Sequence, residues 1–148
     1  MKKIMTLNLI AAACGFSAAA IGAADFGNAA EAKAMLEKAV TAVKADKPAA
    51  LAQIASGQNG FKDRDLYPFC GGPDGNFTAH PTLTGKSMRG LMNAAGYPVG
   101  AKLYEAAKED AIAEVAYQWP RPGTAEPVQK ISYVTKVGDQ VCAVGYYK

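Results

Sequence analysis

The first regular pattern of apolar and polar positions begins after Asn28 and has the spacing of a helix. Asn28 and Glu31 fit a capping box, in which each side chain accepts a hydrogen bond from the other residue's backbone N–H. The apolar positions then recur every three or four residues, at Ala32, Leu36, Ala39, Val40 and Val43. This spacing predicts one amphipathic helix that runs to about residue 45. Asp46 then predicts the N-cap of a second, shorter helix, which Gly57 ends.

The second half of the chain shows the alternation that is typical of strands. A hairpin is predicted from strands at 65–70 and 76–80, which flank a glycine-rich turn. Three further strands are predicted at about 112–119, 128–137 and 141–147, the last two joined by the tight turn Gly138–Asp139.

Two short helices are predicted between these groups of strands. One contains Met88, Leu91 and Met92, and the other runs from about Val99 to Ala107. The order of elements is helix, helix, two strands, short helices and three strands. This order predicts an α+β fold with an antiparallel sheet.

The first 24 residues have the layout of a secretory signal peptide. Lys2 and Lys3 precede an apolar run, and small residues then lead to a cleavage site predicted just before Asp25. We therefore expect a single exported domain over residues 25–148, periplasmic or secreted. A retained membrane anchor is the alternative, and polar residues within the apolar run weaken it. Cys14 ends a poor match to a lipoprotein cleavage box.

Composition narrows the possible classes of function. The chain has 148 residues, half of them hydrophobic, which suits the core of one domain. Without the first 24 residues, which hold two of the 16 basic and none of the 13 acidic residues, the net charge is +1. No basic cluster with interleaved aromatics is present, so nucleic-acid binding is not expected. The exported part holds one histidine and two of the three cysteines, which form no tetrahedral metal site, and no cofactor is expected.

A stiff loop follows the strand predicted at 112–119. It carries Trp119, the only tryptophan, and Arg121, which lies between two prolines that restrict its backbone. In the next strand, period-two alternation places Lys130, Ser132 and Val134 on one face and Ile131 and Tyr133 on the other. Burying an unpaired cation is costly, so Arg121 and Lys130 are expected to face water, an acidic partner or an anionic ligand.

An ordered set of short motifs carries a resemblance to a known family. The set is Phe61, Asp65–Tyr67, Phe69, Asp74–Gly75, Ala79–Pro81, Gly85–Lys86, Trp119–Pro120, Pro122–Gly123, Pro127, Lys130, Ser132–Val134 and Gly145–Tyr147. Over essentially all of the exported part, the chain resembles single Cache domains of the second subtype. The resemblance implies a PAS-like fold with five antiparallel strands, a long N-terminal helix and short helices over the pocket. It also implies an extracytoplasmic ligand-binding part of chemoreceptors or sensor kinases, often for small organic acids.

Two features depart from the pattern of that family. Members that form part of receptors continue into a cytoplasmic output, whereas this chain ends at Lys148, after the last strand. We therefore expect the signal to pass through a separate partner, a membrane sensor kinase or a chemoreceptor. The turn Gly71–Pro73 also lacks the bulkier, acid-containing approach of the family. The N-terminal helix is expected to pack on the sheet, with homodimerisation through it as the alternative.

The resemblance also implies that the first and last strands are neighbours. Cys70 and Cys142 lie inside those two strands, and export supplies oxidising conditions. A disulfide between Cys70 and Cys142 is therefore predicted.

Arg121 is predicted to be the main anchor of the pocket, because its planar fork matches a carboxylate. The other predicted lining residues are Lys130, His80 and Tyr133 as polar contacts, and Trp119, Tyr117, Phe69 and Met88. His80 is expected to hydrogen-bond a carboxylate and to titrate near neutral pH. The alternative for His80 is that it holds local backbone.

These observations predict a small-molecule-binding sensory module without catalysis, with a small organic acid as the favoured ligand. One alternative is a structural or interaction protein with a vestigial pocket. A second is a small periplasmic enzyme that uses His80 or the cysteines. Asp63 and Asp65, on either side of Arg64, are expected to form a solvated charge run rather than a catalytic pair.

Overall fold

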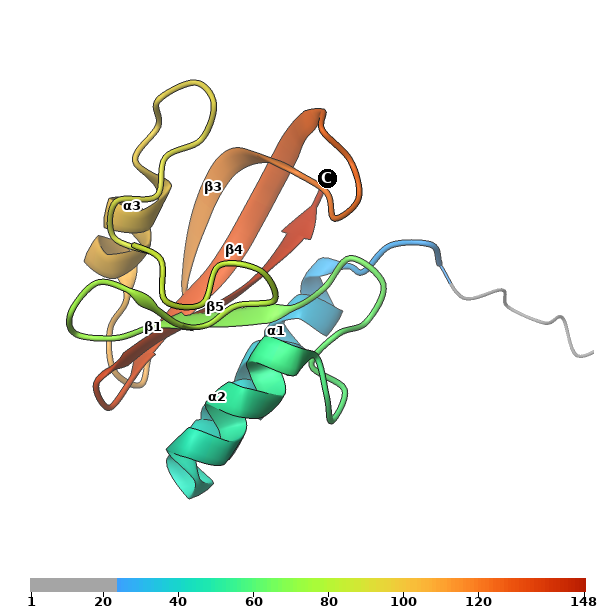
Figure 1. The fold of residues 1–148 in the computed structure, drawn as a ribbon. Helices are drawn as coiled ribbons and strands as arrows, with labels where there is room; N and C mark the ends of the chain where they lie inside the picture. The colour runs from blue at the N-terminus through green and yellow to red at the C-terminus, as the bar shows by residue number, and fades with distance from the viewer. Residues whose placement is uncertain (1–23) are drawn as a thin grey trace, which may run out of the picture.

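The computed structural model describes residues 24–148, so the predicted signal peptide, apart from Ala24, lies outside the described residues. The elements follow one another along the chain as shown in Figure 1: α1 (Ala29–Ala45), α2 (Lys47–Ser56), β1 (Pro68–Gly71), β2 (Phe77–Ala79), α3 (Val99–Ala106), β3 (Ala113–Pro120), β4 (Pro127–Val137) and β5 (Gln140–Tyr147). The predicted α+β fold with a five-stranded antiparallel sheet is confirmed. Within the described part, no helix is both long and apolar enough to cross a bilayer.

Local capping explains where α1 and α2 begin and end. The Asn28 side chain accepts from the Glu31 N–H at 3.0 Å, and the Glu31 carboxylate accepts from the Asn28 N–H at 2.9 Å. Asp46 caps α2 by accepting from the Ala49 N–H at 3.1 Å. Gly57 ends α2 in the left-handed region with a φ of 70°, where glycine is unstrained.

The strand order of the sheet is β2-β1-β5-β4-β3, and neighbouring strands are antiparallel. The first strand, β1, thus lies beside the last, β5, as the resemblance implied. β4 and β5 form a hairpin in which Val137 pairs with Gln140 around the turn at Gly138–Asp139. α3 lies in the long connection between β2 and β3.

The two faces of the sheet carry different layers. α1 and α2 cover one face, and α3 with the loop before it lies over the other, as Figure 1 shows. Core residues between the sheet and α1 and α2 include Leu36, Ile54, Phe61 and Val144. Core residues on the opposite face include Phe69, Leu103, Tyr117 and Val134. We call this second face the pocket face.

The predicted disulfide is confirmed. Cys70 of β1 pairs in register with Cys142 of β5, their Cα atoms are 4.1 Å apart, and their sulfurs are bonded. Both residues are fully buried in the layer beneath α1 and α2. The bond therefore fixes β1 to β5 on the face away from the pocket.

The helix predicted around Met88 does not form, and turns and bends occupy this segment instead. The backbone N–H groups of Met88 and Arg89 both donate to the Gly75 carbonyl at 2.8 Å. Ser87 also pairs with Asn76 as an isolated bridge. These long-range contacts hold the segment against the β1–β2 turn, so tertiary structure overrides the local apolar spacing.

Candidate ligand-binding site

Lys130 lies in β4 with only 1% of its surface exposed. In register it faces Tyr147 of β5 on one side and Tyr117 of β3 on the other. Its aliphatic chain passes close over Gly145 of β5, where an added Cβ atom would collide with Cε of Lys130 and with Oγ of Ser132. Glycine at this position therefore leaves the space through which the ammonium group reaches the interior.

Three aromatic rings surround that ammonium group. Lys130 Nζ lies 4.6 Å from the ring centroid of Tyr67, 5.0 Å from that of Tyr147 and 5.8 Å from that of Phe69. These distances are within the range of cation–π attraction. Nζ also donates a hydrogen bond to the Tyr67 hydroxyl at 3.2 Å. Ring faces and one hydroxyl thus replace the water that surrounds an exposed ammonium group.

Lys130 has no carboxylate partner among residues 24–148, since each ion pair within 4.0 Å in this region involves a different cation. Burial acts to lower the pKa of Lys130, but the oxygens of Tyr117, Tyr67 and Tyr147 raise it above its ordinary value. The three ring faces and the Tyr67 hydroxyl stabilise its ammonium form. A buried charge without a counter-charge is costly. An anion that reached Nζ would remove that cost.

A second polar pair lies next to Lys130. The hydroxyls of Tyr117 and Ser132 are 2.7 Å apart, and both residues are buried. Burial raises the pKa of Tyr117, so its ring carries a neutral hydroxyl at physiological pH. Because a hydroxyl both donates and accepts, this pair can supply a further hydrogen bond to an anion bound by Lys130.

His80 closes the same cage, with its ring 5.5 Å from that of Tyr67. Nδ1 accepts from the backbone N–H groups of Thr82 at 3.0 Å and Leu83 at 3.1 Å, so the neutral ring carries its proton on Nε2. Burial, followed by the charge of Lys130, lowers the pKa of His80 to about 4. The expectation of titration near neutral pH was therefore wrong. His80 does hold local backbone, and its Nε2–H is a neutral donor.

These side chains enclose a small cavity and separate it from an outer cleft. The cavity is lined by Tyr67, Phe69, Phe77, His80, Leu91, Tyr117, Trp119 and Lys130. Its free volume is about 10 Å³, which is room for about one water molecule. The outer cleft has a volume of about 440 Å³. Tyr67, His80 and Trp119 line both spaces and so form the wall between them.

Arg121 lines the outer cleft, and its charge already has a partner. Its Nε is 3.5 Å from Asp65 Oδ2, and its guanidinium carbon lies 4.3 Å from the ring centroid of Phe26 and 5.2 Å from that of Tyr147. Asp65 is only 5% exposed and accepts from the Gly27 N–H at 2.7 Å. The prediction that Asp65 belongs to a solvated charge run was therefore wrong.

A family model described as a Cache domain matches residues 31–147. The chain belongs to the Cache domain family. Cache domains of this kind are extracytoplasmic ligand-sensing domains of chemoreceptors. The resemblance noted from the sequence motifs is thus confirmed.

Individual relatives of this Cache domain are sensory proteins. The methyl-accepting chemotaxis protein McpP of Pseudomonas putida is 32% identical over 56 residues, which are 38% of this chain and 10% of that receptor. A solved periplasmic sensor domain of a chemotaxis protein has a TM-score of 0.60 and 23% identity, covering 80% of this chain and 88% of its own. A solved Cache chemosensory domain, described as showing the structural basis for carboxylic acid recognition, has a TM-score of 0.59 and 20% identity. The match covers 80% of this chain and 91% of that domain. At these identities the structures show the shared fold.

Two of the predicted site residues lie away from the cavity of this Cache domain. Tyr133 is on the face of the sheet that α1 covers, where its ring stacks on Tyr146 at 5.9 Å. The alternation along β4 that separates it from Lys130 explains this placement. Met88 is fully buried in the core of the pocket face but does not line the cavity. The structure brings the other predicted residues to the cavity or, for Arg121, to the outer cleft.

Other residues of the site were not predicted from the sequence. Tyr67 supplies a ring and a hydroxyl to Lys130, and Tyr147 supplies a second ring. A signal for Tyr67 was present, because it is two residues from Phe69 and shares its side of an extended segment. Tyr147 faces Lys130 only through the register of β4 and β5. That register depends on the hairpin turn rather than on any residue type.

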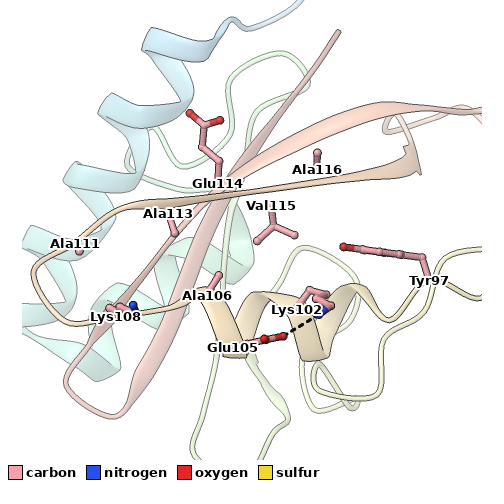
Figure 2. Close-up of a pocket in the computed structure, with 10 residues that line it drawn as sticks. All are labelled: Tyr97, Lys102, Glu105, Ala106, Lys108, Ala111, Ala113, Glu114, Val115 and Ala116. Carbon is pink, nitrogen blue, oxygen red and sulfur yellow. Dashed lines mark hydrogen bonds and ion pairs between the residues drawn. The ribbon is translucent and has the colours of Figure 1, made fainter.

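A groove at the outer edge of the sheet, between α3 and β3, is less suited to a charged ligand (Figure 2). Its volume is about 500 Å³, and much of its lining is alanine. Lys102 and Glu105 of α3 pair with each other at 2.9 Å. Figure 2 shows Glu114 on the opposite side of β3 from Val115. No buried unpaired charge faces this groove within the described residues.

Proposed function

We propose that this Cache domain senses a small carboxylate and that Lys130 is the residue that binds it. The observation that supports this most is a buried ammonium group enclosed by aromatic rings, with no carboxylate of residues 24–148 beside it. In an apolar enclosure, attraction between an anion and an ammonium group is much stronger than in water. The solved relative described for carboxylic acid recognition is consistent with the same chemistry.

The geometry indicates how the carboxylate would be held. The Tyr67 hydroxyl accepts the present hydrogen bond from Lys130, so one carboxylate oxygen would take its place. The other oxygen could accept from the Nε2–H of His80 or from the Tyr117 hydroxyl, both on residues that line the cavity. The free volume between Phe69, Phe77 and the other lining residues is only about 10 Å³, so a long apolar tail does not fit. We therefore favour acids of two or three carbons, which bind as the wall formed by Tyr67, His80 and Trp119 moves outward.

We further propose that the domain acts outside the cytoplasm and passes its signal to a separate membrane chemoreceptor or sensor kinase. Family membership and the sequence pattern of a signal peptide support this location. Dimerisation through α1 stays a prediction. The helix already covers the sheet with its apolar stripe, so a dimer would have to use the opposite, more polar side of α1.

One observation favours a second candidate function. The free volume of the cavity is about 10 Å³, so a vestigial pocket in an interaction protein is the main rival. The two functions differ in one measurable property. A sensor must be stabilised by a ligand that binds only its native state, whereas a protein with a vestigial pocket is not.

The test compares carboxylates with neutral molecules of the same shape. Acetate and propionate are titrated into the protein by calorimetry and by thermal shift, with acetamide and propionamide as controls. We expect the carboxylates alone to bind. Lys130→Met should weaken binding by a factor of about 30 or more, because loss of a buried charge partner costs about 2 to 5 kcal/mol. The free energy of unfolding should stay the same or rise, since a costly buried charge is gone.

Lys136→Met is the matched control, because Lys136 is an exposed lysine on the same strand. It should leave carboxylate affinity unchanged within about twofold, as expected for a solvent-screened charge. Equal binding of propionate by wild type and Lys130→Met would refute the assigned role of Lys130. Absence of binding by every carboxylate in the set would favour the vestigial pocket.

A further inference from the structure

Both arginines that line the outer cleft are already paired with carboxylates, whereas the exposed Lys62, which also lines it, has no carboxylate within 4.0 Å among the described residues. Arg64 pairs with Glu31 at 2.7 Å and with Asp63 at 2.9 Å. Arg121 pairs with Asp65 at 3.5 Å. Beyond the wall shared by the cleft and the cavity, Lys130 is uncompensated and also buried, whereas the charge of Lys62 is exposed to water. The site therefore offers one strong position for one carboxylate.

Asp65 is held in place and cannot easily turn away from Arg121. It is 5% exposed, and its Oδ1 accepts from the Gly27 N–H at 2.7 Å. Its Oδ2 and Arg121 Nε are both buried, and neither has a hydrogen-bond partner among the described residues. The two groups thus attract each other as charges without a hydrogen bond that would satisfy them fully. In this low-dielectric position the charge of Asp65 is poorly screened.

Arg121 is close enough to Lys130 for a longer ligand bound at Lys130 to reach it. Arg121 Cζ and Lys130 Nζ are 5.2 Å and 5.0 Å from the same ring centroid, that of Tyr147, so their separation is at most the sum of these distances. A dicarboxylate such as succinate, with one ion pair at each end, can bridge a gap of that order. Its outer carboxylate would enter the cleft that Arg121 lines. There it would meet the guanidinium of Arg121, which Asp65 already accompanies at 3.5 Å, and the exposed ammonium group of Lys62.

We infer that Asp65 determines the specificity of the site by restricting its ligands to those with a single carboxylate. This inference rests on the proposed function, because it requires one carboxylate on Lys130. Asp65 acts in two ways: it keeps the guanidinium of Arg121 from the ligand, and it repels a second negative charge. Specificity thus depends on a repulsive element as well as on the attraction of Lys130.

The test uses succinate and its monoamide, succinamate, which have the same length and differ by one charge. Propionate reports binding at Lys130 alone. In wild type, succinamate should bind at least about tenfold more tightly than succinate. Asp65→Asn keeps an oxygen for the Gly27 N–H but removes the charge. It should strengthen succinate binding by about tenfold or more, as expected for a charge-assisted bond to the freed Arg121, and change propionate binding by about twofold or less.

Two control variants separate the local effect from overall charge. Asp63→Asn makes the same change of net charge at an exposed partner of Arg64, and it should not favour succinate over succinamate. Adding Arg121→Ala to Asp65→Asn should remove the gain in succinate binding. A loss of the gain in the double variant but not in Asp63→Asn assigns the effect to Arg121.

Binding of propionate tests the proposed function, and binding of succinate tests the role of Asp65. If wild type binds no propionate, the proposed function fails. If wild type binds propionate and Asp65→Asn gains nothing for succinate over succinamate, Asp65 is not the determinant, although the function stands. Should Asp65→Asn fail to fold, Arg121→Ala in the wild-type background decides. Its preference for succinamate over succinate should persist or grow, because the charge of Asp65 remains, and loss of that preference would show that Asp65 does not repel a second carboxylate.

Discussion

On the face that α1 and α2 cover, β4 and β5 present Tyr133, Cys142 and Val144, whereas on the pocket face the same strands present Lys130 and Gly145. The covered face is closed by apolar packing and by a disulfide. The pocket face instead surrounds a buried charge with rings and hydroxyls. One pair of strands therefore provides both stability and a charged site, and alternation along the strands keeps the two apart.

The difference between the two faces explains how so small a domain tolerates the buried charge of Lys130. Burying Lys130 without a carboxylate destabilises the native state. Apolar packing and the disulfide on the covered face must offset this cost. Nothing in the packing beneath α1 and α2 needs Lys130, so ligand contacts can change without loss of that core. Substitutions on the two faces should consequently separate stability from binding.

The largest expected effect comes from the covered face. Replacing Cys70 and Cys142 together by alanine opens a loop whose ends are 72 residues apart in sequence. The entropic model gives roughly 4 to 5 kcal/mol for a loop of this length, and strain lowers the measured value. We expect the free energy of unfolding, measured with urea, to fall by about that amount. Propionate affinity, measured well below the unfolding transition, should stay within about twofold.

The control for this prediction is wild type treated with a reductant. Its thermal midpoint should fall toward that of the double variant. Mass spectrometry of unreduced protein that showed two free thiols would contradict the disulfide. A large loss of propionate affinity in the folded double variant would show that the two faces are coupled.

Much of the division between the covered face and the pocket face could be predicted from the sequence, because its causes are local. The caps at Asn28 and Asp46 depend on residues within three positions, and both helices formed where the spacing placed them. The alternation in β4 separated Lys130 from Tyr133 correctly. Placing Tyr133 in the pocket nevertheless ignored that alternation, and the structure puts it on the covered face.

The remaining features depend on distant residues. Asp65 is buried because Gly27, 38 residues earlier, donates to it, and because the loop after β3 brings Arg121 beside it. No local pattern distinguishes this aspartate from the exposed Asp63. In the same way, the contacts of Met88 and Arg89 with Gly75 turn a segment with helical spacing into a loop. Pairings of this kind are fixed by topology and not by propensity.

An intermediate effect is expected from the glycine beneath Lys130. In Gly145→Ala the new methyl would collide with Cε of Lys130 and Oγ of Ser132, so the ammonium group must shift. We expect propionate affinity to fall by about tenfold or more and the free energy of unfolding to fall by about 1 to 3 kcal/mol, as is usual for overpacking. Calorimetry and urea unfolding measure the two quantities separately.

Gly71→Ala is the matched control for this variant. It also adds a methyl to a buried strand glycine on the pocket face, but the methyl meets Met88 and Tyr104 instead of Lys130. It should lower stability by a similar amount and leave propionate affinity within about threefold, because the position of Nζ is unchanged. Similar losses of affinity in both variants would mean that general disturbance of the pocket face, and not displacement of Lys130, causes the effect.

The smallest effect concerns His80 and pH. Burial, followed by the charge of Lys130, lowers its pKa to about 4 from an ordinary value of 6.5. Between these values the unfolded chain binds a proton that the folded ring does not, so this contribution is full above pH 6.5 and is lost as pH falls through 4. Allowing for partial exposure, we expect it to be on the order of 1 to 2 kcal/mol.

The comparison of wild type with His80→Asn isolates this contribution, because an asparagine oxygen can still accept from the Thr82 and Leu83 N–H groups but does not titrate. Urea unfolding at pH 7 and at pH 4.5 should show a larger loss of stability for wild type than for His80→Asn. Carboxylates elsewhere titrate in both proteins and cancel in the difference. Equal losses in the two proteins would mean that His80 is protonated in the folded state, and its Nδ1 would then be unable to accept the two backbone hydrogen bonds. Propionate should reduce the difference, because an anion on Lys130 removes the charge that helps to keep His80 neutral.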